Sequence, residues 1–124
     1  MTQSTTPSRP KLLYVEDEVI VALDVADGLR EAMNFDVHVA HNLRSAQRLV
    51  EKHAFEFALL DMNLGNGERS SELGEALAKD GVNVVFASGY NRNEIDAFSD
   101  FPLIEKPFQL SDIAAAFQLS KQPA

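Results

Sequence analysis

The stretch Phe55-Glu-Phe-Ala-Leu-Leu-Asp-Met-Asn-Leu64 decides how the rest of the chain is interpreted. Residues Phe55 to Met62 are mostly apolar, too few for a typical helix, and are soon followed by Gly65. A short apolar run that ends in turn residues is typical of a strand buried on both faces of a parallel sheet. Asp61 stands at the carboxyl end of this strand, where open α/β sheets bind their ligands. On position alone, Asp61 either caps the following loop or belongs to a site.

Similar apolar segments alternate with helical patterns along the chain. Further strands are predicted at residues 11–15, 35–40, 82–87 and 102–104. Helices are predicted where apolar residues recur at steps of three and four, in the segments 19–33, 43–53, 73–80 and 110–117, whereas residues 91–100 are weakly helical at best. Strands that alternate with helices require right-handed crossovers and a parallel sheet between helices. The sequence therefore predicts an α/β fold of the (βα)5 type, a doubly wound five-stranded parallel sheet with a short or irregular fourth helix.

Several finer features of the helices are also predicted. Asn42 and Ser111 are expected to cap the second and last helices, and Gly81 is expected at the left-handed position that closes the third. The third helix should point Leu73, Ala76 and Leu77 inward. The buried face of the first helix is predicted to contain Val19, Ala22, Leu23, Ala26, Leu29 and Met33.

The bulk properties indicate one small globular domain. Residues 1–10 are rich in Thr, Ser and Pro and are predicted to be a disordered arm, with the domain at 11–120 and a tail at 121–124. A net charge of −8 argues against contact with nucleic acid or an anionic membrane. The absence of cysteine excludes disulfides and thiol catalysis. The sequence contains no apolar run long enough to span a bilayer and no stretch with the pattern of a signal-peptide h-region, so a soluble cytoplasmic protein is expected.

Polar residues follow the predicted strands at the edge where parallel strands share their carboxyl ends. Glu16 and Asp17 follow the first strand, Asp61 ends the third, Ser88 follows the fourth and Lys106 follows the fifth. Clustered carboxylates repel one another unless their pKa values rise or a cation binds, and oxygen ligands suit Mg²⁺. A hydroxyl and an ammonium beside such a cation would complete an anion site suited to phosphoryl transfer. A carboxylate can itself be the nucleophile and form an aspartyl phosphate.

This constellation resembles the phosphoacceptor site of response-regulator receiver domains from two-component signalling. The resemblance covers roughly residues 11–119, with each motif at the end of the expected strand. It implies the flavodoxin-like strand order 2-1-3-4-5. It also implies that Asp61 is phosphorylated and that Asp17, Asp61 and the backbone carbonyl of Asn63 coordinate Mg²⁺, while Glu16 holds a metal-bound water.

The resemblance assigns roles to the remaining residues of the site. Ser88 would donate a hydrogen bond to the phosphoryl group, Lys106 would pair with it, and the bond between Lys106 and Pro107 would be cis. Asn63 and Tyr90 match positions that tune dephosphorylation.

Two features depart from the usual receiver pattern. Leu103 stands where receivers commonly carry a Tyr or Phe that moves inward on activation, and the segment between Ser88 and Lys106 is short. Phe86-Ala87-Ser88-Gly89-Tyr90 resembles the Phe-Ala-Thr-Gly-Tyr signature of the FAT GUY receivers, many of which act alone in signalling that includes general stress responses. Tyr90 is therefore either the residue that senses phosphorylation or a loop aromatic that packs on the sheet edge.

These features predict a single-domain response regulator of a phosphorelay, not an enzyme in the ordinary sense. Its expected partners are a sensor histidine kinase or histidine phosphotransfer protein, which donates the phosphoryl group, and an unknown downstream protein. A dehalogenase-type phosphatase would need an aspartate where Val19 stands, and a flavodoxin would need a Ser/Thr/Gly-rich loop after the first strand. The remaining alternative is a receiver-like interaction module that works without phosphorylation.

Overall fold

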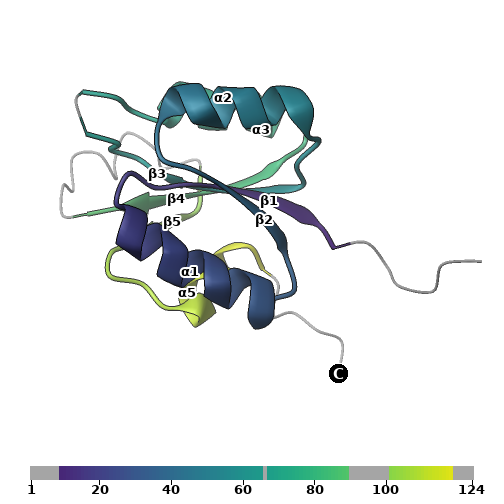
Figure 1. The fold of residues 1–124 in the computed structure, drawn as a ribbon, viewed down its shortest axis with the longest axis vertical. Coiled ribbons are helices and arrows are strands. Elements are labelled where there is room, and N and C mark those ends of the chain that lie inside the picture. Colours follow the sequence, from purple (N-terminus) through teal and green to yellow (C-terminus); the bar gives the residue numbers. More distant parts are fainter. Residues whose placement is uncertain (1–8, 66, 90–100, 119–124) are drawn as a thin grey trace, which may run out of the picture.

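Five parallel strands form the centre of the protein. The computed structural model describes residues 9–65, 67–89 and 101–118. Its strands are β1 (Lys11–Val15), β2 (Asp36–Ala40), β3 (Phe57–Asp61), β4 (Asn83–Ser88) and β5 (Leu103–Glu105), in the order β2-β1-β3-β4-β5 (Figure 1). All four neighbouring pairs are parallel. The predicted α/β architecture and the 2-1-3-4-5 order are thus confirmed.

Helices cover both faces of this sheet. They are α1 (Val19–Glu31), α2 (Leu43–Lys52), α3 (Ser71–Lys79) and α5 (Leu110–Ala116). Figure 1 shows α2 and α3 on one face and α1 and α5 on the other. The predicted short or irregular fourth helix falls at residues 91–100, which lie outside the described residues. Within the described residues, no helix has the length and apolar character needed to cross a membrane.

The apolar strands bury side chains on both faces because neighbouring residues of a strand point in opposite directions. Leu12, Tyr14 and Leu59 pack on the α1 and α5 side, whereas Leu13 and Leu60 pack on the α2 and α3 side. All five are at most 1% exposed. This two-sided burial explains why β1 and β3 appear in the sequence as continuous apolar runs.

The predicted buried face of α1 is partly wrong. Ala22, Ala26 and Leu29 are buried, but Val19 and Leu23 are 51% and 59% exposed. The helix begins beyond the carboxyl end of β1, so its first turn has no strand beneath it. Leu23 lies beside the line of residues that meets the sheet. Apolar periodicity alone therefore overstated how much of this helix is covered.

The predicted helix ends have mixed outcomes. Asn42 caps α2, since its side-chain oxygen accepts a hydrogen bond from the Ser45 N–H at 2.8 Å, and Gly81 has the predicted positive φ of 90° after α3. The prediction of Ser111 as a cap is wrong. Gln109 precedes the first residue of α5, and its N–H donates to the Asp112 carboxylate at 2.8 Å. Asp112 thus caps the start of α5 from within the first turn of the helix.

Helix α3 approaches β4 closely through a glycine. A Cβ atom on Gly74 would lie 2.3 Å from the ring of Phe86, which is fully buried and meets Phe101 edge-on. Leu77 is buried as predicted, but Ala76 is exposed, because Gly74 occupies the contact with the sheet. The missing side chain at Gly74 therefore sets the distance between helix and strand.

Candidate functional site

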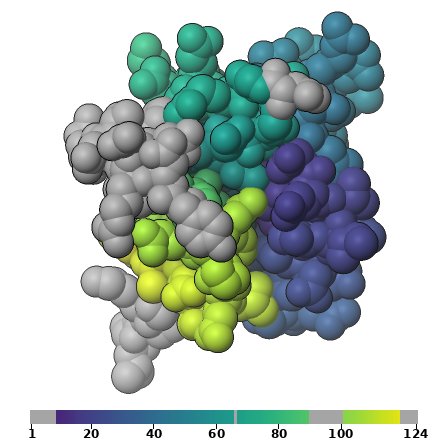
Figure 2. Space-filling model, turned by 90° about the vertical axis from the view of Figure 1, so that its left-hand side faces the viewer, coloured from purple at the N-terminus to yellow at the C-terminus, as the bar shows by residue number. Residues whose placement is uncertain are grey.

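Adjacent strands deliver the polar residues to one edge of the sheet. Glu16 directly follows β1, Asp61 ends β3, Ser88 ends β4 and Lys106 directly follows β5. Because these strands are parallel neighbours, their carboxyl ends lie at the same edge of the sheet. Figure 2 shows the protein from the side of this edge, where early, middle and late parts of the chain come together. Residues up to 90 positions apart in sequence are thus in direct contact.

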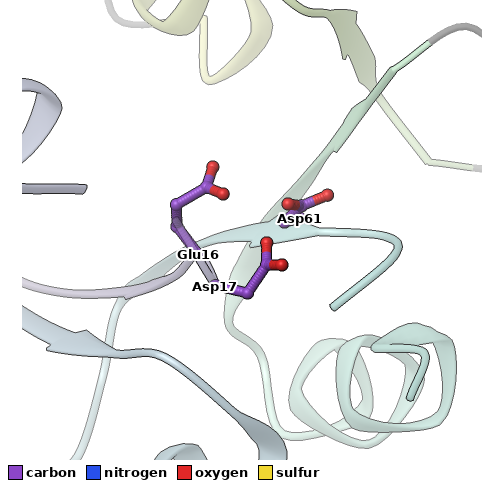
Figure 3. Close-up of side chains that lie close together, drawn as sticks. All are labelled: Glu16, Asp17 and Asp61. Atoms are coloured by element: carbon purple, nitrogen blue, oxygen red, sulfur yellow. The ribbon is translucent and has the colours of Figure 1, made fainter. Parts of the chain in front are cut away.

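Three carboxylates form a compact cluster at this edge. Glu16, Asp17 and Asp61 each offer an oxygen, and these oxygens lie within 4.8 Å of one another (Figure 3). Glu16 and Asp61 are 1% and 4% exposed, whereas Asp17 is exposed. The cluster therefore combines two buried acids with one that faces solvent.

Lys106 provides the positive charge for the two buried acids. Its Nζ donates to Asp61 Oδ2 at 2.7 Å and to Glu16 Oε2 at 3.2 Å, and it also lies 3.0 Å from Glu16 Oε1. The peptide bond that joins Lys106 to Pro107 is cis. In this arrangement the ammonium is the counterion of both carboxylates.

Burial dominates the protonation equilibria of the site. It raises the pKa of Glu16 to about 7, and the charge of Asp61 adds to this, while hydrogen bonds from Lys106 and the Glu18 N–H oppose it. Burial also raises the pKa of Asp61, again against the hydrogen bond from Lys106. For Lys106, burial disfavours the ammonium, but hydrogen bonds to Asp61 and Glu16 outweigh it and raise the pKa. The folded protein therefore holds protons at this cluster more tightly than separate carboxyl groups would.

This proton affinity leads to a prediction for stability. When folding raises the pKa of an acid, the free energy of unfolding falls as the pH rises from the ordinary pKa to the pKa in the folded state. Glu16 should therefore make the metal-free protein less stable as the pH rises from about 4.5 to 7. In EDTA, the melting temperature is expected to fall over this window. Mg²⁺ should raise it more at pH 7.5 than at pH 5, because the ionised acids bind the metal.

The difference between melting curves with and without Mg²⁺ isolates the site. The pKa of His53 is lowered by burial and by the charge of His38, so its contribution to the stability of the protein increases with pH, opposite to that of Glu16. His53 is not part of the cluster, so its contribution does not depend on Mg²⁺. Magnesium stabilisation of equal size at both pH values would contradict the prediction.

Other predicted residues have distinct positions around the cluster. The Asn63 N–H donates to Asp61 Oδ1 at 3.3 Å. Ser88 is buried, and its hydroxyl has no hydrogen-bond partner among the described residues. Leu103 packs in the α3-side cluster with Phe86. Tyr90 lies outside the described residues, so both interpretations of it stay open.

Three residues at the site were missed by the sequence analysis. The Ser70 hydroxyl is buried and donates to the Asp61 carbonyl at 2.7 Å, which ties the end of the loop after β3 back to the strand. His41 Nδ1 lies 2.9 Å from the Glu16 carbonyl. Tyr14 is buried beneath the site. A loop serine, one histidine of three and a strand tyrosine carry no sequence signal that distinguishes them.

A cleft of about 810 Å³ opens beside the cluster. It is bounded by Ile20 and Val21 of α1, by Gly89 after β4, and by Lys106 and Phe108 after β5. An anion in this cleft would meet Lys106, whose ammonium is hydrogen-bonded to Asp61. The site can thus accept a negatively charged group next to a buried carboxylate.

Comparisons with known proteins agree with this geometry. SdrG from Sphingomonas melonis Fr1 is 32% identical, with a TM-score of 0.76 over 91% of this chain and 97% of that one. A response regulator from Burkholderia pseudomallei is 28% identical, with a TM-score of 0.76 over 88% of this chain and 66% of its own. The chain belongs to the response-regulator receiver domains of two-component systems.

Curated sequences give a weaker match. The transcriptional regulatory protein PdtaR of Mycobacterium tuberculosis is 25% identical over 115 residues, which are 89% of this chain. The chain spans 56% of the length of that relative. No protein-family model matches the sequence.

Proposed function

We propose that residues 11–120 accept a phosphoryl group on Asp61 in a phosphorelay and change their protein contacts as a result. The observation that carries this proposal is the buried Asp61 carboxylate, which lies 2.7 Å from Lys106 and within a cluster of three acids. The chain would catalyse only its own phosphorylation and dephosphorylation. Its donor would be a phosphohistidine in a sensor kinase or in a phosphotransfer protein.

The donor set at this edge fits Mg²⁺. Carboxylate oxygens from Asp17 and Asp61, the carbonyl of Asn63 and a water held by Glu16 are the hard ligands that this ion prefers. The Burkholderia relative was determined with a phosphorylated aspartic acid and a calcium ion, and SdrG in a BeF3-activated conformation. Both support the proposal. A bound Mg²⁺ would offset negative charge on the phosphoryl oxygens.

Different residues of the chain would have different roles in the transfer. An Asp61 carboxylate oxygen attacks phosphorus in line with the departing imidazole, and the phosphorus–nitrogen bond breaks. Its electron pair stays on the imidazole nitrogen, which takes a proton from water. Lys106 and Ser88 would donate hydrogen bonds to the oxygens of the transferred group, where charge is concentrated.

An exposed apolar patch on α1 supports a protein donor. Val19, Ile20, Val21 and Leu23 are between 37% and 82% exposed, and Ile20 and Val21 border the cleft that leads to Lys106. Exposed apolar side chains gathered beside a site are typical of a protein contact. A donor that covers this patch would bring its phosphohistidine to the cleft.

The donor surface is tested by Ile20→Ser, which removes the most exposed apolar side chain of the patch. We expect roughly tenfold slower transfer from a phosphorylated histidine protein, because an apolar anchor of the contact is lost. The rate with acetyl phosphate should not change, since a small donor needs no patch. Ala76→Ser on the exposed face of α3 is the matched control. Equal loss with both donors would contradict this role.

The acceptor function is tested by intact-mass measurement. The chain is incubated with acetyl phosphate and Mg²⁺, and in parallel with acetyl phosphate and EDTA. A gain of one phosphoryl group that requires Mg²⁺ is expected. No gain from acetyl phosphate or from a panel of phosphorylated histidine proteins would overturn the proposal in favour of an interaction module that works without phosphorylation.

A further inference from the structure

Tyr14 is part of β1, the strand that leads into the carboxylate cluster. It precedes Glu16 by two residues. The pairing of β1 with β2 continues to Glu16, whose N–H donates to the Ala40 carbonyl, so side-chain alternation places Tyr14 and Glu16 on the same face. Its side chain is 1% exposed and packs with the apolar residues between the sheet, α1 and α5. The phenol therefore brings a polar hydroxyl into an apolar layer, at the point where that layer meets the site.

One buried polar atom at this point lacks a partner, and another depends on Lys106 alone. The Tyr14 hydroxyl makes no hydrogen bond within the described residues, and the one contact printed there for Glu16 Oε1 is its ion pair with Lys106 Nζ at 3.0 Å. Leaving a buried polar group unpaired is unfavourable, because the group has lost its hydrogen bonds to water. Burial and the charges of Glu16 and Asp61 raise the pKa of Tyr14. The hydroxyl therefore keeps its proton and is free to donate it to an acceptor.

Glu16 depends on a lysine that it shares. Lys106 contacts Asp61 at 2.7 Å and Glu16 at 3.0–3.2 Å, and the other donor to the Glu16 carboxylate is the Glu18 N–H at 3.2 Å. In the proposed function, Lys106 pairs with a phosphoryl oxygen once Asp61 is modified. Glu16 then loses its strongest donor while it remains buried.

We propose that Tyr14 is a positioning residue for Glu16: its hydroxyl donates a hydrogen bond to the Glu16 carboxylate when Lys106 turns to the phosphoryl group. This contact holds the carboxylate toward the water that it presents to the metal. The inference rests on the proposed function and adds to it a residue that acts only through Glu16. The exchange gives the Tyr14 hydroxyl an acceptor and gives Glu16 a donor in place of Lys106.

The test is a double-mutant cycle on the full chain. Mg²⁺ affinity is measured for the unmodified chain, Tyr14→Phe, Glu16→Gln and the double variant, from the amide NMR shifts of Asp17 and Asn63. The titrations are run with Mg²⁺ alone and with Mg²⁺ plus beryllofluoride, which occupies the phosphoryl position. Phenylalanine keeps the ring in the core and removes only the hydroxyl.

We expect Tyr14→Phe to weaken Mg²⁺ binding about fivefold with beryllofluoride and less without it. In the Glu16→Gln background the same change should have no effect. Ile113→Val, which removes a methyl group from the same buried layer, should leave the affinity unchanged. An unchanged affinity in Tyr14→Phe, or an equal loss in both backgrounds, would overturn the proposal, because a purely structural role gives one of these results.

A measurement on the unmodified chain covers the case in which Tyr14→Phe does not fold. In a half-deuterated solvent, a slowly exchanging tyrosine hydroxyl splits the resonance of its Cζ carbon into two lines. We expect this splitting for Tyr14 when beryllofluoride and Mg²⁺ are bound. A single averaged line under these conditions would overturn the proposal.

The two proposals fail in different ways. If the unmodified chain gains a phosphoryl group but the cycle shows no coupling, only the role of Tyr14 is lost. If no phosphoryl group is gained while the cycle shows coupling, the acceptor function is lost and the Tyr14–Glu16 contact stands.

Discussion

The Asp61→Asn variant is expected to show no gain of phosphoryl mass under conditions in which the unmodified chain gains one group. An amide oxygen has the shape of the carboxylate but is a far weaker nucleophile, so the covalent step is removed and the side-chain volume is kept. Lys106, 2.7 Å from Asp61 Oδ2, still finds an acceptor in the asparagine carbonyl. Loss of the mass gain should therefore occur in a folded protein.

Two controls make this result interpretable. Glu72→Gln, in the first turn of α3, removes an acid outside the cluster and should not affect the mass gain. Melting in EDTA should show Asp61→Asn to be at least as stable as the unmodified chain at pH 7.5, because one of the repelling carboxylates is gone. A full mass gain in Asp61→Asn would instead identify Glu16 or Asp17 as the acceptor.

Replacing Lys106 with methionine is expected to have the largest effect on stability. It leaves two buried carboxylates, on Glu16 and Asp61, without a cation, and breaking a buried ion pair from one side typically costs 3–5 kcal/mol. We expect the free energy of unfolding in EDTA at pH 7.5 to fall by about 3 kcal/mol, since proton uptake offsets part of the loss. The rate of phosphoryl gain should fall about 100-fold, because the lost ammonium no longer balances charge on the phosphoryl oxygens.

Urea unfolding at two pH values tests the cause of this instability. At pH 5 the burial-raised pKa of Glu16, about 7, favours its neutral form, and burial shifts the pKa of Asp61 in the same direction, so the loss should be much smaller than at pH 7.5. The matched control is Lys79→Met, which removes one positive charge at the exposed end of α3. A loss of equal size at both pH values would mean that Lys106 stabilises the fold through packing rather than charge.

The sequence was sufficient for the fold and for most of the cluster, for a clear physical reason. Apolar runs such as Leu12 to Val15 and Ala58 to Leu60 leave few alternatives to a parallel sheet that is buried on both faces. Once the strands are parallel, Glu16, Asp61 and Lys106 must gather at one edge, whatever the details of packing. Their proximity follows from topology alone.

The extent to which a side chain is covered by other elements could not be predicted in this way. The exposure of Val19 depends on where α1 starts relative to the end of β1, and the apolar period of the helix gives no information about that position. The rings of His38 and His53 lie with their centroids 4.2 Å apart and are tilted by 41°, although the two residues come from a strand and a helix end that share no sequence pattern. The burial of Tyr14 and Glu16 similarly depends on how deeply the end of β1 is covered.

In the proposed function, Lys106 would also couple metal binding to covalent modification. Its ammonium is attached to the chain, so its effective concentration at Glu16 and Asp61 stays constant when dissolved ions change, and a divalent ion must compete with it. A phosphoryl group on Asp61 would draw Lys106 away and leave carboxylate oxygens available to the ion. Because linkage holds in both directions, an ion that binds more tightly after modification must favour modification by the same factor. A single lysine would then couple the magnesium level around the protein to the fraction of chains that carry the signal.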